Sequence, residues 1–163
     1  MLLLLVVFPS NRSTSGNHIP PPGNTCERTG KGAVFQVQCY RVNFQTILSS
    51  LVNVTSSVTG LELQHANIHH LNRRHLKRRH LKHFENLSIL KLLDCDIDTI
   101  DADAFHNLTK LTDITLERNN IRQLHPYMFS PLEKLLSLTI HEHLLGSLPD
   151  YVFYGLRKLQ RLG

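Results

Sequence analysis

Histidine is the residue type in this chain that first suggests chemistry, because the sequence contains eleven histidines and imidazole is a common zinc ligand. The closest groups are His69-His70 and His141-Glu142-His143. A zinc site needs three or four converging ligands, and the second group lacks the H-E-x-x-H spacing of a zinc protease. We therefore expect surface histidines, with no metal and no cofactor.

The cysteines offer little support for catalysis. Cys26, Cys39 and Cys95 allow one disulfide bond and one remaining thiol. A nucleophilic cysteine needs a lowered pKa and a neighbouring base, whereas Cys95 occupies a position of the repeat described below that predicts a buried, inert thiol. The chain also has no glycine-rich phosphate loop, no Ser-His-Asp motif and no paired carboxylates at a catalytic spacing. The sequence thus predicts a protein that is not an enzyme.

A basic segment offers a different kind of site. The pentapeptide RRHLK occurs twice in succession, over residues 73–77 and 78–82, and one copy accounts for three of the charges behind the formal net charge of +5. This segment could bind a glycosaminoglycan or another anionic surface. A duplication tolerated in the variable convex segment outside the strand is the favoured explanation, and nucleic acid is not expected because no aromatic residue interleaves with the charges. The anionic-surface candidates are Arg73, Arg74, Lys77, Arg78, Arg79 and Lys82.

The elements that carry these residues follow from a periodic pattern of apolar side chains. From Val58 onward the sequence repeats L-x-x-L-x-L-x-x-(N/C)-x-L-x-x-L, and later copies start at one constant interval, at Leu87, Leu111, Leu135 and Leu159. Phe105, Phe129 and Phe153 keep the same period. The first copy is longer by the length of one RRHLK, and removing that pentapeptide would restore the period. This copy consists of Val58, Leu61, Leu63, Ala66, Ile68 and Leu71.

Each repeat has the periodicity of one coil of a solenoid. The L-x-L segment predicts a short strand with alternating inward and outward side chains, and the later Ile, Leu and Phe close the coil from the other side. One coil cannot bury its apolar side alone, so neighbouring coils stack and their strands form a parallel sheet. A polar side chain at the ninth position would bond the adjacent coil. Asn119 fits this role and Cys95 substitutes for it, whereas Ala66 and His143 depart from it.

The spacing and the phenylalanine positions resemble extracellular leucine-rich-repeat proteins of the Slit, chaoptin and Toll-ectodomain kind over residues 26–163. The resemblance implies an α/β solenoid: a horseshoe with a short parallel sheet on its concave face and loops or short helices on its convex face. It also implies that Cys26 and Cys39 form the single disulfide of a reduced N-terminal cap. Such a cap covers the exposed end of the apolar core.

The expected domain organisation begins with an apolar run. Residues 1–8 resemble the core of a signal peptide, 9–25 a disordered leader, 26–57 the cap, and 58–163 about four repeats with the start of a fifth. Because the last strand would expose an apolar end, we expect the native protein to continue beyond Gly163. A membrane anchor would also have to lie beyond that residue, since no stretch is long enough to span a bilayer.

Export of the protein is expected from several weak signals together. The leader, the repeats and Asn-x-Ser/Thr sequons predict a glycoprotein that is secreted or displayed on the cell surface. The expected glycosylation sites are Asn53, Asn86 and Asn107. A further sequon, at Asn11, lies in the leader.

Outward-facing strand residues are the remaining candidates for function, and they favour recognition of a protein ligand or co-receptor. They are polar, carry charges of both signs, and include Leu93 as an apolar anchor. Asp94 would lie at the edge of the same strip. The predicted partner-binding residues are Glu62, Gln64, Lys91, Leu93, Asp113, Thr115, Glu117, Thr139 and His141.

Overall fold

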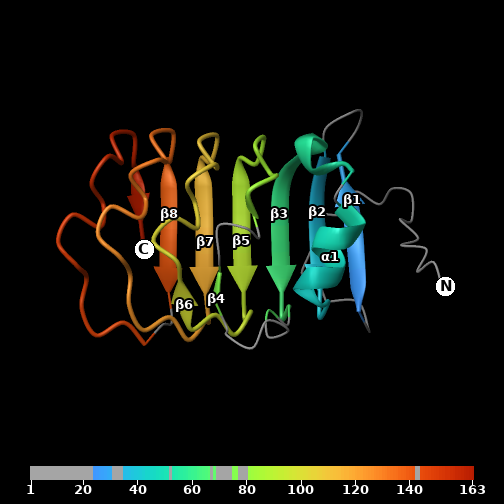
Figure 1. Ribbon diagram of the computed structural model, residues 1–163, viewed down its shortest axis with the longest axis horizontal. Helices are drawn as coiled ribbons and strands as arrows, with labels where there is room; N and C mark the ends of the chain where they lie inside the picture. The colour runs from blue at the N-terminus through green and yellow to red at the C-terminus, as the bar shows by residue number, and fades with distance from the viewer. Residues whose placement is uncertain are drawn as a thin grey trace.

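A stack of parallel strands dominates the computed structural model, which describes residues 24–30, 35–51, 53–66, 68, 75–76, 81–141 and 144–163. Seven strands form one sheet in the order β1-β2-β3-β5-β7-β8-β9, and all neighbours beyond β1 and β2 pair in parallel. Figure 1 shows the long strands side by side in chain order. Their bounds are β1 Thr25–Thr29, β2 Phe35–Tyr40, β3 Val58–Gln64, β5 Ile89–Leu93, β7 Asp113–Glu117, β8 Ser137–His141 and β9 Arg161–Leu162.

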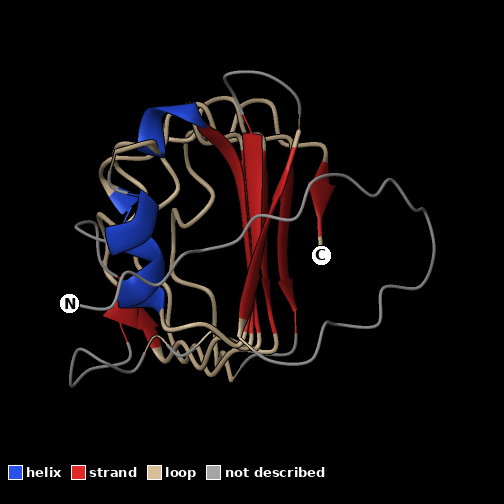
Figure 2. Ribbon diagram, turned by 90° about the vertical axis from the view of Figure 1, so that its right-hand side faces the viewer, coloured by secondary structure: helices blue, strands red, loops and turns tan. Residues whose placement is uncertain are grey.

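The sheet forms one side of the solenoid and turns form the opposite side (Figure 2). Each coil returns through turns closed by backbone bonds between residues three apart, such as Leu108 to Phe105 and Leu132 to Phe129. Such bonds tighten the chain without producing a long helix. The predicted solenoid with a parallel sheet is confirmed. No helix among the described residues is long and apolar enough to cross a membrane.

The core lies between the sheet and the turns and follows the repeated apolar positions. Strand side chains alternate, so that Leu90, Leu92, Ile114 and Leu116 are fully buried and their neighbours face outward. The buried rings of Phe105 and Phe129 stack across neighbouring coils with their centroids 5.5 Å apart. Burying side chains of this size stabilises a fold by about 1.5–3 kcal/mol each.

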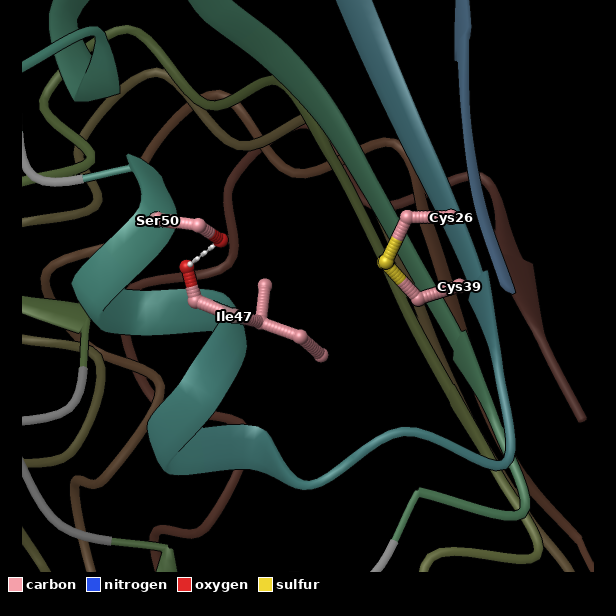
Figure 3. The surroundings of a disulfide bond; sticks show 4 residues. All are labelled: Cys26, Cys39, Ile47 and Ser50. Carbon is pink, nitrogen blue, oxygen red and sulfur yellow. Dashed lines mark hydrogen bonds between the residues drawn. A yellow bond between two sulfur atoms is a disulfide. The ribbon is translucent and has the colours of Figure 1, made fainter. Parts of the chain in front are cut away.

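Strands β1 and β2 and the helix that follows them lie at one end of this core. Strand β1 pairs antiparallel with β2, and Cys26 lies directly opposite Cys39, with which it forms a disulfide bond. The predicted bridge is therefore confirmed. Helix α1 (Phe44–Leu51) follows, and Asn43 caps it by accepting a hydrogen bond from the Thr46 amide at 3.3 Å. Figure 3 shows Ile47 pointing from α1 toward the disulfide.

Short elements complete the chain. The 3-10 helix η1 (Thr55–Ser57) precedes β3, and β4 (His75–Leu76) pairs in parallel with β6 (Thr99–Ile100). This pairing places Leu76 opposite Ile100. Leu71, predicted to occupy the last apolar position of the first copy, lies outside the described residues.

Candidate protein-binding face

The outward surface of the parallel sheet, which we call the sheet face, gathers side chains from strands β2 to β9 into rows. Strand pairing aligns residues that occupy the same position in successive coils. The middle row contains Gln38, Glu62, Lys91, Thr115 and Thr139. The row nearest the ends of the strands contains Tyr40, Gln64, Leu93, Glu117 and His141, and the row nearest their starts contains Gln36, Gly60, Ile89, Asp113, Ser137 and Arg161.

All nine predicted partner-binding residues lie on this face. Glu62, Lys91, Thr115 and Thr139 are consecutive neighbours in one row, although each comes from a different coil, and Gln64, Leu93, Glu117 and His141 are consecutive in the next. Leu93 is partly buried rather than fully exposed. The structure brings these side chains together, while their role in binding stays a prediction.

A network of polar side chains centres on Glu62. The Glu62 carboxylate accepts a hydrogen bond from Gln64 Nε2 at 2.7 Å and lies 3.1 Å from Lys91 Nζ. Burial would raise the pKa of Glu62, but hydrogen bonds from Gln64 and Gln38 and the charge of Lys91 outweigh burial and lower it. The two side chains differ in exposure to solvent, because Lys91 is 43% exposed and Glu62 only 15%. Lys91 is thus the accessible member of the pair.

A small hollow lies beside this network at Gly60, which has no side chain. Gly60 occupies a sheet-face position where the neighbouring strands carry Gln36 and Ile89. A Cβ atom at Gly60 would lie 2.6 Å from Gln36 Cγ, so the side chain of Gln36 lies across the glycine. The resulting cavity of about 200 Å³ is also bordered by Glu62 and Lys91. The face therefore has relief near β3 and is not a flat surface.

A charged row borders the face where the strands end, formed by Arg41, His65, Asp94 and Arg118. Each of these residues has a left-handed backbone, with φ between 48° and 54°, and each donates its amide hydrogen to the last carbonyl of the next strand. Arg118 Nε donates to Asp94 Oδ2 at 2.7 Å, and His65 Nε2 lies 3.8 Å from the same oxygen. The predicted edge position of Asp94 is confirmed, and its carboxylate lies between the basic side chains of Arg118 and His65.

Several residues of this surface were missed by sequence reasoning, which treated residues 26–57 only as a cap. Strand β2 extends the sheet face with Gln36, Gln38 and Tyr40, and the edge of the Tyr40 ring contacts His65 with centroids 5.2 Å apart. The signal was present in the sequence FQVQCY, whose alternate residues Phe35, Val37 and Cys39 are buried. The same alternation that identified the repeat strands would have found it.

Two sets of buried or half-buried polar side chains hold the coils in register behind this face. Asn119 Oδ1 accepts from the amides of Cys95 and Ile97, and its Nδ2 donates to the carbonyls of Leu92 and Glu117. Cys95 Sγ lies 3.4 Å from the Leu63 carbonyl oxygen, and burial raises the pKa of its thiol to about 12. The ninth-position prediction is therefore confirmed for Asn119, and Cys95 is an inert member of the same ladder.

A second ladder, which the sequence did not reveal, runs along the starts of the strands. Thr59 Oγ1 donates to the Phe35 carbonyl, Ser88 Oγ to that of Thr59, and Thr112 Oγ1 to that of Ser88. Hydroxyl side chains thus link four successive strands, β2, β3, β5 and β7, through their entry segments. Both ladders fix the spacing of the strands and therefore the positions of the rows on the sheet face.

Some predicted sites fall partly or wholly outside the described residues. Of the basic segment, Arg73, Arg74, Lys77, Arg78 and Arg79 lie outside them, and Lys82 is exposed just after the buried Leu81. Among the sequons, Asn53 is exposed, while Asn86 and Asn107 are half-buried. Residues 1–23, 69–70 and 142–143 also lie outside, whereas Thr25, predicted as the end of the leader, begins strand β1. Within the described residues no group of three or more His, Cys, Asp or Glu could hold a metal ion.

Comparison with known proteins identifies the repeat. Residues 85–144 match the family model described as leucine rich repeat. No curated protein sequence matches the chain. The structure is similar to Toll in the complex of Toll with Spatzle from Drosophila, with a TM-score of 0.58 and 24% sequence identity. The match covers 64% of this chain and 14% of the Toll chain, and it supports the fold.

Two further solved structures resemble the chain more loosely. The TLR13–ssRNA13 complex has a TM-score of 0.49 at 25% identity, covering 76% of this chain and 19% of the other. An internalin, inlF from Listeria monocytogenes, has a TM-score of 0.41 at 15% identity, covering 66% of this chain and 41% of the other. This chain therefore spans less than half the length of each of these proteins.

Proposed function

We propose that this chain is a non-catalytic leucine-rich-repeat solenoid that binds a partner protein outside the cell through its sheet face. The observation that carries the proposal is the alignment of outward side chains from β2 to β8 into continuous rows. Repeat solenoids bind through such extended surfaces because every coil contributes side chains at the same height. Toll, whose solved complex contains Spatzle, is a precedent for a protein partner on this fold.

The chemistry of the sheet face supports a protein partner. Protein interfaces combine a partly apolar centre with a polar rim, and a few central side chains contribute most of the affinity. Here Ile89 and Leu93 are apolar members of the two rows that flank the middle row, and Lys91 lies between them on the same strand. The charged row of Arg41, His65, Asp94 and Arg118 forms one border. We infer that Leu93 and Lys91 lie near the centre of the contact.

An extracellular location is supported by covalent chemistry. Disulfide bonds persist in oxidising compartments and are rare in the cytosol, and the cap contains the Cys26–Cys39 bond. The sequons at Asn53, Asn86 and Asn107 agree with passage through the secretory pathway. Glycosylation at these sites is part of the proposal, and mass spectrometry of protein secreted from eukaryotic cells, before and after enzymatic removal of N-glycans, tests it.

The binding proposal is tested by screening the displayed chain against an array of secreted proteins and ectodomains. The informative variant combines Lys91→Glu with Glu117→Lys, which reverses two sheet-face charges and leaves the net charge unchanged. Glu133→Lys combined with Lys134→Glu is the matched control, since both residues are exposed on a turn away from the sheet face. We expect the sheet-face variant to lose at least tenfold in affinity for a partner and the control to retain it.

The proposal is contradicted if a partner binds the sheet-face variant as tightly as the wild type, because the sheet face is then not the binding surface. Thermal melting of both variants guards against a trivial loss, because Lys91→Glu places two carboxylates together at the site of the Glu62–Lys91 pair. Binding that is lost only in a variant that has also unfolded would not count as support.

A second candidate function rests on the duplicated RRHLK segment over residues 73–82, and we propose it as the alternative. Its closely spaced positive side chains suit a sulfated glycosaminoglycan, and the exposure of Lys82 agrees with an accessible segment. Heparin chromatography tests it: deleting one pentapeptide and changing the Arg and Lys of the other to Gln should lower the salt concentration at elution. Unchanged elution would rule out this segment as the binding site.

A further inference from the structure

Three tyrosines form an exposed cluster on the turns of the last two coils, away from the sheet face. The rings of Tyr127 and Tyr151 are stacked, with centroids 5.3 Å apart and an angle of 5° between their planes. Tyr154 meets Tyr127 edge to face, with centroids 5.4 Å apart and an angle of 78°. Tyr127, Tyr151 and Tyr154 are 47%, 63% and 61% exposed, so solvent and oxidants reach all three rings.

The backbone holds the stacked pair in register. Tyr127 and Tyr151 are one repeat apart in the sequence and occupy the same position of successive coils. The Tyr127 amide donates a hydrogen bond to the Tyr151 carbonyl at 3.2 Å, and both residues have a left-handed backbone with φ of 60° and 61°. This conformation is uncommon for a bulky residue, so its occurrence in both coils is an outlier that calls for an explanation. The shared left-handed backbone projects the Tyr127 and Tyr151 rings in the same direction.

We propose that Tyr127 and Tyr151 form an oxidative cross-linking site, at which a one-electron oxidant such as a haem peroxidase with hydrogen peroxide couples the two rings into dityrosine. Each phenol loses one electron and its hydroxyl proton, which gives two phenoxyl radicals. The radicals combine through ring carbons ortho to the oxygens, and both rings regain their phenol form when the ortho hydrogens move to oxygen. The two electrons and two protons reduce one hydrogen peroxide to two waters.

The geometry selects this pair over the other tyrosines. Nearly parallel rings in contact need only slide past one another to bring two ortho carbons together, whereas the edge-to-face ring of Tyr154 must turn by a large angle. Tyr40, the only other tyrosine of the chain, lies on β2 and contacts His65. Coupling of Tyr127 to Tyr151 would close a covalent bridge between two adjacent coils and so restrain their separation on unfolding.

The test is controlled oxidation of the folded full chain at low protein concentration with horseradish peroxidase and limiting hydrogen peroxide. We expect dityrosine fluorescence in the monomer band of a denaturing gel. Trypsin should then release residues 123–134 bonded to residues 135–157, with a mass two hydrogen atoms below the sum of the two peptides. Fragmentation should place the bond at Tyr127 and Tyr151. The thermal unfolding midpoint of the cross-linked monomer should be higher than that of the untreated chain.

Phenylalanine variants make the assignment decisive, because Phe keeps the ring contacts and removes only the hydroxyl. Tyr127→Phe and Tyr151→Phe should each abolish the monomer signal, while Tyr154→Phe and Tyr40→Phe should retain it. The proposal is overturned if the monomer yields no dityrosine, if cross-links join only separate chains, or if Tyr151→Phe retains the signal. Loss of the signal in Tyr154→Phe would equally overturn it, since it would assign the coupling to the edge-to-face pair.

Discussion

Asn119 and Glu62 both link neighbouring coils through polar side chains, but they do so in different surroundings. Asn119 lies inside the solenoid, is 3% exposed, and bonds mainly to backbone groups of the preceding coil. Glu62 lies on the sheet face and bonds to the side chains of Gln64, Gln38 and Lys91. Backbone groups buried behind the sheet have no access to water, whereas the partners of Glu62 can be solvated if the carboxylate is lost.

This difference separates the residues that maintain the fold from those that are free to specify a partner. Replacing an interior ladder residue leaves buried donors and acceptors without partners, which limits what can occupy its position. Replacing a sheet-face residue changes a surface contact whose net worth is small. The sheet face can therefore vary in sequence while the coils behind it stay in register. Substitutions at Asn119, at Thr112 and at the Glu62–Lys91 pair test this separation, with expected losses of stability that decrease in that order.

The largest effect is expected from Asn119→Ala. The substitution leaves the amides of Cys95 and Ile97 and the carbonyl of Leu92 without their side-chain partner in a buried region. Unsatisfied buried groups cost about 1–3 kcal/mol each, and their effects are not additive, so we expect the free energy of unfolding to fall by about 3 kcal/mol. Urea denaturation followed by circular dichroism measures it.

Asn120→Ala is the matched control for that experiment. Asn120 is the next residue in the chain and is half-buried, and its Nδ2 donates to Asp96 Oδ1 at 2.9 Å rather than to a buried backbone group. Its loss should cost about 1 kcal/mol or less. Equal losses at Asn119 and Asn120 would contradict the distinction between interior and surface polar contacts.

An intermediate effect is expected from Thr112→Val in the hydroxyl ladder. Thr112 Oγ1 donates to the Ser88 carbonyl at 3.1 Å, but that oxygen also accepts from the amides of Thr112 and Asp113. Valine keeps the shape of threonine, and the carbonyl keeps two donors, so the loss should be about 1 kcal/mol. The same denaturation experiment measures it. A loss as large as that of Asn119→Ala would show that the two ladders are equivalent.

The smallest effect is expected from the pair of Glu62 and Lys91. The pKa of Glu62 is lowered in the fold, so this group contributes stability above its ordinary pKa and loses it as the pH falls through the folded value. Glu62→Gln should therefore flatten the acid side of the stability profile. At neutral pH, a double-mutant cycle with Lys91→Met should give a coupling of about 0.5 kcal/mol. An unchanged acid limb in Glu62→Gln would show that the carboxylate is not stabilised by its neighbours.

The sequence predicted the residues whose environment is set within a single coil. Leu90 and Leu92 had to be buried on one side of a strand because side chains alternate, and Asn119 stood where a side-chain amide can reach the preceding coil. The same alternation placed Glu62, Lys91 and Thr115 on the opposite side. These predictions succeeded because a strand's periodicity is local and needs no knowledge of its neighbours.

Features that depend on how one coil meets the next were not predictable in this way. The pairing of Leu76 with Ile100 joins two separate coils and could not be read from the spacing within the longer first repeat. The hydroxyl ladder required the entry segments of four strands to lie at the same height, since each hydroxyl bonds to a carbonyl of the preceding strand.

The amino-acid sequence by itself determined the solenoid, its constant period, its buried positions and, from β3 to β8, the members of the middle row and of the row nearest the strand ends. The tertiary structure alone decided the register of the longer first repeat, the contribution of β2 to the sheet face, and the stacking of Tyr127 on Tyr151. The physical reason is that burial is encoded by spacing within one coil, whereas contacts between coils depend on their relative alignment, which hydrogen bonds between separate strands establish.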